Sequence, residues 1–218
     1  MSAILFGSIS TLADTSELQR DAFNRAFEKH GLDWHWDRDT YLGMLESSGG
    51  ADRIATQAER TGEDVDAAAV HATKSELFRQ SLPGAGIGPR PGVLETIRAA
   101  KTDGVRLALV TTTSRDNVDA LLTALAPDLD RDDFALVVDT SVVDTPKPDP
   151  AAYRYALDAL GESPDACVAV EDNLGGVAAA VGAALRVVAF PNANTAGHDF
   201  AAATERVDRL DHGALLRT

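Results

Sequence analysis

The chain has 218 residues, 44% of them hydrophobic, and a formal net charge of −14. This is enough apolar material for one sizeable core, alone or with a small second domain. The acidic surface repels nucleic acid and anionic membranes, so a main function in binding either is excluded. The single cysteine excludes an internal disulfide and favours a reducing compartment. The first residues, MSAILFGS, lack the basic segment of a signal peptide, and no apolar run reaches membrane-spanning length, which predicts a cytoplasmic protein.

The first apolar run of strand length covers residues 3–8. Only helical patterns follow it, at residues 17–30, 38–46, 51–60 and 66–81, until a segment rich in Gly and Pro begins at Pro83. We therefore expect a helical domain over residues 16–86, inserted after the first strand, with hinges near Thr15 and Gly86.

Beyond Gly86, strand and helix patterns alternate. Strands are expected at residues 105–111, 134–139, 167–171 and 186–190, and helices at residues 91–102, 115–125, 150–160 and 174–183. This alternation predicts an α/β, Rossmann-like core over residues 1–15 and 87–218, in which a parallel sheet carries helices on both faces. Ligands of such sheets bind at the carboxyl ends of the strands.

Four polar segments lie at those ends or in the loops that follow them. They are FGSISTLADT from Phe6, VTTTSRDNV from Val110, KPDPAAY from Lys147 and VEDNLGG from Val170. Taken singly, each has a structural explanation, such as helix capping or a solvated turn. Their order and spacing together predict that they surround one crevice.

In order and spacing, these segments resemble the motifs of subfamily I of the haloacid dehalogenase-like superfamily, closest to the β-phosphoglucomutase and CbbY-like sugar-phosphate phosphatases. The resemblance covers essentially the whole chain and includes ELQRDAFNRAF from Glu17, GLDWHWD from Gly31, GGADRI from Gly49 and RPGV from Arg90. It implies a Rossmann-like core, a helical cap inserted after the first strand, and hydrolase chemistry on phosphoric monoesters.

The chain departs from the family at the residues that perform this chemistry. The family's first motif has the form D-x-D-G-T, in which the first Asp attacks phosphorus and the second is the general acid and base. Gly7 and Ile9 stand at these two positions, and Gln19 stands where the cap commonly carries a His. None of the three can transfer a phosphoryl group or a proton, so classical phosphatase activity is predicted to be absent or very weak.

The resemblance assigns the other motifs to binding. Thr111 and Thr112, with the amides that follow, match the motif that holds phosphoryl oxygens, and the Lys147 ammonium matches the one that neutralises phosphate. With two aspartates gone, Lys147 is expected to face fewer anions, so that an oxyanion could bind without metal. Asp172 and Glu171 remain as acidic ligands, and Mg²⁺ binding is expected to be weak. Candidates for recognising the rest of the ligand are the cap residues Gln19, Arg20, Arg53 and Lys74, with a solvated helix charge as the alternative for Lys74.

The leading hypothesis is a catalytically deficient phosphatase homologue that binds a sugar phosphate, another small phosphorylated metabolite or an inorganic anion, with an unidentified protein partner as a further option. The rival is an active magnesium-dependent phosphatase or phosphomutase with a displaced nucleophile at Ser8 or Ser10. Strand alternation argues against the rival by aiming both serines away from the Gly7 side, and neither has an evident base. A third hypothesis is a structural dimerisation protein, in which the phosphate-binding residues are dispensable.

Overall fold

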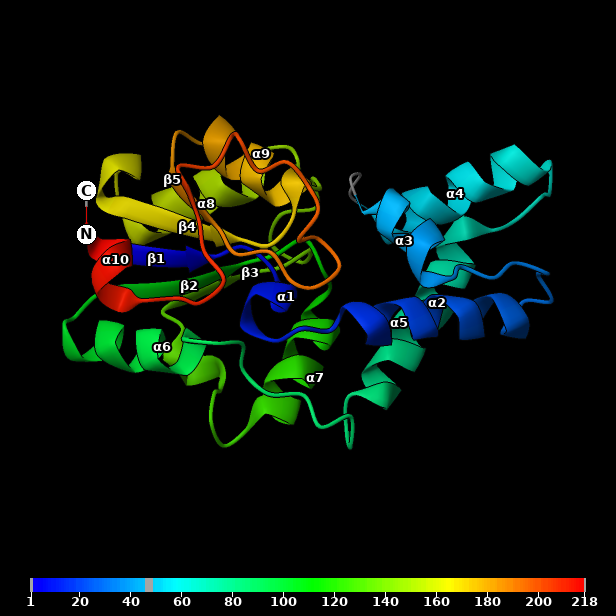
Figure 1. Ribbon diagram of the computed structural model, residues 1–218, viewed down its shortest axis with the longest axis horizontal. Helices are drawn as coiled ribbons and strands as arrows, with labels where there is room; N and C mark the ends of the chain where they lie inside the picture. Colours follow the sequence, from blue (N-terminus) through cyan, green and yellow to red (C-terminus); the bar gives the residue numbers. More distant parts are fainter. Residues whose placement is uncertain (1, 46–48, 218) are drawn as a thin grey trace.

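The computed structural model describes residues 2–45 and 49–217 and contains one six-stranded parallel sheet (Figure 1). The strands are β1 (Ala3–Phe6), β2 (Arg106–Val110), β3 (Leu136–Val138), β4 (Cys167–Glu171), β5 (Arg186–Ala189) and β6 (Glu205–Arg206). Their order in the sheet is β3-β2-β1-β4-β5-β6. The chain moves outward from β1 to β3 and then crosses to the other side of β1, so the topological switch point lies beside β1. A ligand crevice is expected there.

Helices cover both faces of the sheet, which confirms the predicted α/β class. Alternate residues of β1 enter different cores: Ile4 and Phe6 face one side, and Ala3 and Leu5 face the other. The first side is covered by α6 (Val93–Thr102), α7 (Arg115–Leu125) and α10 (His212–Leu216), and the second by α8 (Ala151–Leu160) and α9 (Leu174–Gly182). Because both faces are buried, the inner strands are apolar except at their ends, where β2 and β5 begin with an arginine and β4 ends at Glu171.

Four helices stand apart from the sheet and pack on one another (Figure 1). They are α2 (Ser16–Lys29), α3 (Arg38–Met44), α4 (Gly50–Thr61) and α5 (Ala67–Ser81). Aromatic side chains fill their centre, where the Trp36 ring lies 4.7 Å from Phe27 and 4.8 Å from Phe23 between centroids. The last residue of the helix expected at 38–46 lies outside the described residues. We call α2–α5 the cap, and its boundaries at residues 16 and 86 stay a prediction.

Arg90 ties the segment after the cap to two core loops. Its buried guanidinium donates to the carbonyl oxygens of Ser10 at 3.1 Å, Phe190 at 2.8 Å and Pro191 at 2.6 Å. It also lies 3.5 Å from the centroid of the Phe190 ring. One planar cation therefore joins the short helix Ile9–Leu12 that follows β1, the loop after β5 and the return from the cap.

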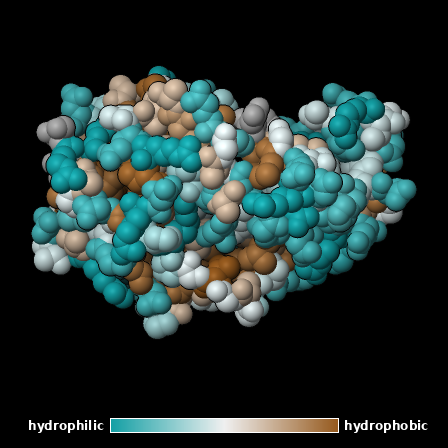
Figure 2. Space-filling model, viewed as in Figure 1, coloured by the Kyte–Doolittle hydropathy of each residue, from teal (hydrophilic) through white to brown (hydrophobic). Residues whose placement is uncertain are grey.

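The sequence patterns did not predict the shortest elements, which are α1 (Ile9–Leu12), α10, β6 and the 3-10 helices Arg131–Asp133 and Pro164–Ala166. Each is too short to show a period. Within the described ranges, no helix is long and apolar enough to cross a membrane. The face drawn in Figure 2 is mostly hydrophilic, as the net charge of −14 leads one to expect, and hydrophobic residues form separate patches on it.

Candidate ligand-binding site

A cavity of about 600 Å³ lies between the carboxyl ends of the strands and the cap. This volume suits a small-molecule ligand. The residues that the sequence singled out converge on it from both parts: Gly7, Ile9, Thr111, Thr112, Lys147 and Asp172 from the core, and Gln19, Arg53 and Lys74 from the cap. Glu171 and Arg20 do not line it.

Gly7 follows β1, and its amide donates to the Val170 carbonyl at 2.8 Å. The space where a side chain would stand at this position is filled. A Cβ built on Gly7 would overlap the Glu171 carboxylate and the Tyr153 hydroxyl. The nucleophile position of the family is therefore occupied by two other side chains of the same protein.

The Glu171 carboxylate is fully buried and paired with Lys147. Its Oε1 accepts hydrogen bonds from the Lys147 Nζ at 2.6 Å and the Tyr153 hydroxyl at 2.6 Å, while Oε2 has no hydrogen-bond partner among the described residues. Burial raises the pKa of Glu171, an effect that the neighbouring Lys147 ammonium opposes. Burial and the Glu171 charge likewise raise the pKa of Tyr153.

Lys147 is also buried, and its ammonium donates to the Val110 carbonyl at 2.7 Å and to the Gly7 carbonyl. Its charge is thus met by Glu171 and by backbone oxygens. The expectation that Lys147 faces fewer anions than in active members of the family stays a prediction; in this structure its ammonium pairs with the Glu171 carboxylate.

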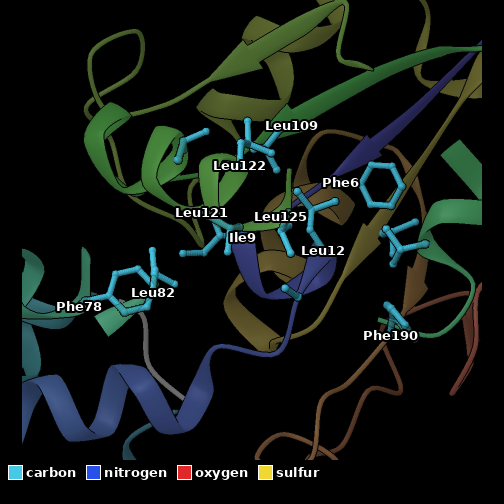
Figure 3. Close-up of a cluster of buried hydrophobic side chains, with 14 of the residues drawn as sticks. Phe6, Ile9, Leu12, Phe78, Leu82, Leu109, Leu121, Leu122, Leu125 and Phe190 are labelled. Carbon is cyan, nitrogen blue, oxygen red and sulfur yellow. The ribbon is translucent and has the colours of Figure 1, made fainter. Parts of the chain in front are cut away.

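Ile9 begins α1, and its side chain is only 5% exposed. It belongs to the apolar cluster of Figure 3, together with Leu12, Leu121 and Leu125. The position that the resemblance aligns with the family's acid and base thus carries an aliphatic side chain, which cannot transfer a proton.

Asp172 follows β4, and neutral donors satisfy both of its oxygens. Oδ1 accepts from the Ser8 hydroxyl at 2.7 Å and the Asn173 amide at 3.0 Å, and Oδ2 accepts from the Asn192 amide at 3.1 Å. Within residues 2–45 and 49–217, no group of three His, Cys, Asp or Glu side chains converges as metal ligands do. Since Glu171 points to Lys147, the residues present fit a tight Mg²⁺ site poorly.

Ser8 lines the cavity and has a carboxylate partner in Asp172, so the expectations that it points away and lacks a base are wrong. Its lone pairs are nevertheless engaged. Ser8 Oγ caps α1 and accepts from the backbone amides of Ser10 at 3.0 Å and Thr11 at 3.3 Å. A hydroxyl that donates once and accepts twice has no lone pair left for attack on phosphorus.

The loop after β2 presents hydroxyls and a helix N-terminus to the cavity. Thr111 is buried, its amide donates to the Val138 carbonyl at 2.9 Å, and its Oγ1 accepts from the Thr113 amide at 3.2 Å. Thr112 and Ser114 line the wall beside it. Ser114 caps α7, whose N-terminus favours an anion at this point.

The cap wall carries basic side chains. Lys74 is only 6% exposed, so the reading of Lys74 as a solvated helix charge is wrong. Its Nζ donates to the Gln19 Oε1, and Arg53 donates to the Met44 carbonyl at 2.9 Å. Burial lowers the pKa of Arg53. His71, which sequence reasoning missed, lies on the same wall. Burial together with Lys74 and Arg53 lowers its pKa to about 4.

Arg20 is engaged outside this wall. It donates to the Glu17 carboxylate at 2.7 Å and to the Trp36 carbonyl at 3.2 Å. These contacts hold Arg20 within the cap, so it is left out of the candidate site.

Two asparagine side chains bridge the cap and the core, and sequence reasoning missed both. Asn194, in the loop after β5, donates to Glu17 at 3.0 Å and accepts from Arg38 at 3.3 Å. Arg79 of α5 donates to the Asn117 Oδ1 at 3.1 Å. Both contacts join the cap to the core, and Arg79 and Asn117 also line the cavity.

Comparison with known proteins agrees with this architecture. The model of a family described as haloacid dehalogenase-like hydrolase matches residues 1–184. The protein CbbY of Rhodobacter capsulatus is 40% identical over 217 residues, which are 98% of this chain and 96% of that protein. The phosphorylated carbohydrates phosphatase of Thermotoga maritima is 28% identical over 186 residues, 85% of this chain and 82% of that protein.

Among solved structures, the crystal structure of CbbY from Rhodobacter sphaeroides in complex with phosphate has a TM-score of 0.89 and 40% identity, covering 96% of this chain and 94% of that one. A variant of the same CbbY in complex with xylulose-1,5-bisphosphate matches equally well. By sequence and by structure, this chain belongs to the haloacid dehalogenase-like hydrolase family.

Proposed function

We propose that this protein binds a sugar phosphate or a similar small anion in the cavity under the cap and lacks the phosphatase chemistry of its family. The observation that carries the proposal is the nucleophile position, where Gly7 leaves a space that Glu171 and Tyr153 fill. Phosphoryl transfer needs an anion in line with phosphorus and a proton donor for the leaving oxygen. Gly7 and Ile9 supply neither.

Several features support binding. The loop of Thr111 and Thr112, the N-terminus of α7 and the Lys147 ammonium meet at one end of the cavity, and Arg53 and Lys74 lie on the cap wall. CbbY of R. sphaeroides, at 40% identity, has been crystallised with phosphate and, as a variant, with xylulose-1,5-bisphosphate. We infer a phosphorylated carbohydrate as the ligand class here, and a second anionic group would lie at Arg53.

Mg²⁺ adds little to this binding in our proposal. Haloacid dehalogenase-like hydrolases typically use Mg²⁺, but here both Asp172 oxygens accept from neutral donors and Glu171 is committed to Lys147. We expect phosphate affinity to change by less than about threefold when Mg²⁺ is added, a free-energy difference below about 0.7 kcal/mol. Calorimetric titration of inorganic phosphate, with and without the metal, measures this directly.

The deciding experiment compares the native protein with the Gly7→Asp/Ile9→Asp variant over a panel of sugar mono- and bisphosphates with Mg²⁺. We expect no turnover by the native protein together with measurable phosphate binding. Turnover by the variant would identify the best ligand. Circular dichroism must first show that the variant folds, since one new carboxylate enters an apolar cluster and the other a filled space. Rapid hydrolysis by the native protein would overturn the proposal.

The rival, an active enzyme with a displaced nucleophile, has one supporting contact, the hydrogen bond from Ser8 to Asp172. It predicts a phosphoserine at residue 8 after incubation with a substrate. We expect intact mass spectrometry to show no phosphoryl adduct on the native protein, just as on Ser8→Ala, which lacks the hydroxyl.

A further inference from the structure

Lys74 is a buried amine on the wall of the cavity. Its Nζ lies 4.7 Å from the centroid of the Phe23 ring and 5.3 Å from that of Phe78, and it donates to the neutral Gln19 Oε1. Among the described residues, no carboxylate forms an ion pair with it. Buried ammonium groups are normally paired, because an unpaired charge in an apolar site is costly.

The charged groups around Lys74 add to this cost. Arg53 acts on it from α4, and His71 lies one turn away on α5. Asp52 is the carboxylate near this group, and its charge raises the pKa values of Arg53 and His71. Burial, and next the Arg53 charge, lower the pKa of Lys74 to about 7. At neutral pH much of the amine is therefore unprotonated and carries a lone pair, as nucleophilic lysines require.

We propose that Lys74 is a carbonyl-reactive amine and that the cavity takes phosphorylated aldehydes or ketones, which it holds through a reversible imine. This inference rests on the proposed function and narrows its ligand class. The Nζ lone pair attacks the carbonyl carbon, and the carbon–oxygen π pair moves to oxygen. The two amine hydrogens leave with that oxygen as water, and the carbon–nitrogen double bond forms. Addition of water reverses the step, so no oxidant or reductant is required.

The chain suits a direct test because it has only four lysines, Lys29, Lys74, Lys101 and Lys147. The native protein is incubated near pH 7 with dihydroxyacetone phosphate, or with glycerol 3-phosphate, which differs in carrying an alcohol in place of the ketone. Cyanoborohydride then reduces any imine to a stable amine. Peptide mapping by mass spectrometry locates the adduct, and calorimetry without the reductant gives the affinities.

We expect one ketone-dependent adduct, at Lys74, and binding of dihydroxyacetone phosphate at least about tenfold tighter than that of glycerol 3-phosphate. In Lys74→Arg, which keeps a long basic side chain but has no primary amine, both the adduct and the tenfold preference are expected to vanish. The matched control Lys101→Arg changes an exposed lysine and leaves both intact. If Lys74→Arg does not fold, peptide mapping of the native protein still shows whether the adduct forms at Lys74.

The outcomes are separable. Equal binding of the two phosphates without an adduct at Lys74 overturns this inference and leaves the proposed function standing. Adducts spread evenly over Lys29, Lys74 and Lys101 also overturn it, because they show ordinary surface chemistry. Failure of both phosphates to bind, with no adduct, overturns the inference and the proposed function together.

Discussion

Gly7 and Glu171 share one space: the Glu171 carboxylate stands where the Cβ of any larger residue at position 7 would lie. Gly7→Ala therefore forces one methyl group into a packed, buried site, and we expect it to lower the free energy of unfolding by about 1–3 kcal/mol. Urea denaturation measures the change. Gly43→Ala is the matched control, because none of the described residues lies within 4 Å of a Cβ at that helical position. It should be neutral or slightly stabilising.

The same relationship predicts coupling between the two sites. Removing the carboxylate with Glu171→Ala frees the space, so adding Gly7→Ala in that background should cost less than it does in the native protein. We expect a coupling free energy of about 1 kcal/mol or more in a double-mutant cycle. Strict additivity of the two single effects would show that the overlap is relieved elsewhere.

Arg90 carries a second stability prediction. Arg90→Met keeps much of the packing against Phe190 but leaves three carbonyl oxygens without their donor. We expect a loss of about 3 kcal/mol or more in the free energy of unfolding. The comparison variant Arg98→Met removes an exposed arginine whose nearest carboxylate oxygen, in Asp128, is 3.8 Å away. Its effect should stay within about 0.5 kcal/mol, and equal losses in the two variants would contradict the role given to Arg90.

His71 predicts a dependence of stability on pH. Its pKa falls from 6.5 to about 4 on folding, so between these values the unfolded chain binds a proton that the folded protein does not. The contribution of His71 therefore makes the free energy of unfolding rise as pH increases through this window and fall as pH decreases. The slope is at most about 1.4 kcal/mol per pH unit. In urea denaturation across this window, this part of the slope should disappear in His71→Asn, and a profile equal to that of the native protein would contradict the prediction.

Asn194 predicts a measurable titration. The hydrogen bond from its amide is the main cause that lowers the pKa of Glu17, ahead of the contribution from Arg20. In Asn194→Ala, an NMR titration of the Glu17 carboxyl carbon should show its pKa moving up toward the ordinary value of 4.5. Arg25→Ala, on the same helix but paired with Asp21, serves as the control. An unchanged Glu17 pKa in Asn194→Ala would mean that this amide does not bridge the cap and the core.

The sequence predicted the layout of the fold because strand alternation and helical periodicity are properties of neighbouring residues. Five of the strands and the eight longer helices lie at or near their expected positions. The helix Ile9–Leu12 was missed because four residues show no period, yet it decides where Ile9 points. The Ile9 side chain thereby joins the core cluster as well as the wall of the cavity.

The site was predicted less completely, because side-chain direction depends on distant partners. Lys147, Asp172 and Thr111 converge as their motifs implied. That Glu171 turns to Tyr153 could not be read from VEDNLGG, since the space that it enters exists only because residue 7 is glycine. His71 carried a signal that was overlooked: it lies three residues before Lys74 and so shares one helix face with it.

The filled space at Gly7 sets the order in which substitutions are tolerated. An aspartate at this one position meets a packed carboxylate and a tyrosine hydroxyl, so it costs stability on its own. An aspartate at Ile9 must enter an apolar cluster. Under the proposed function, restoring the two aspartates of the family motif one at a time is therefore unfavourable unless the Glu171 side chain is replaced first.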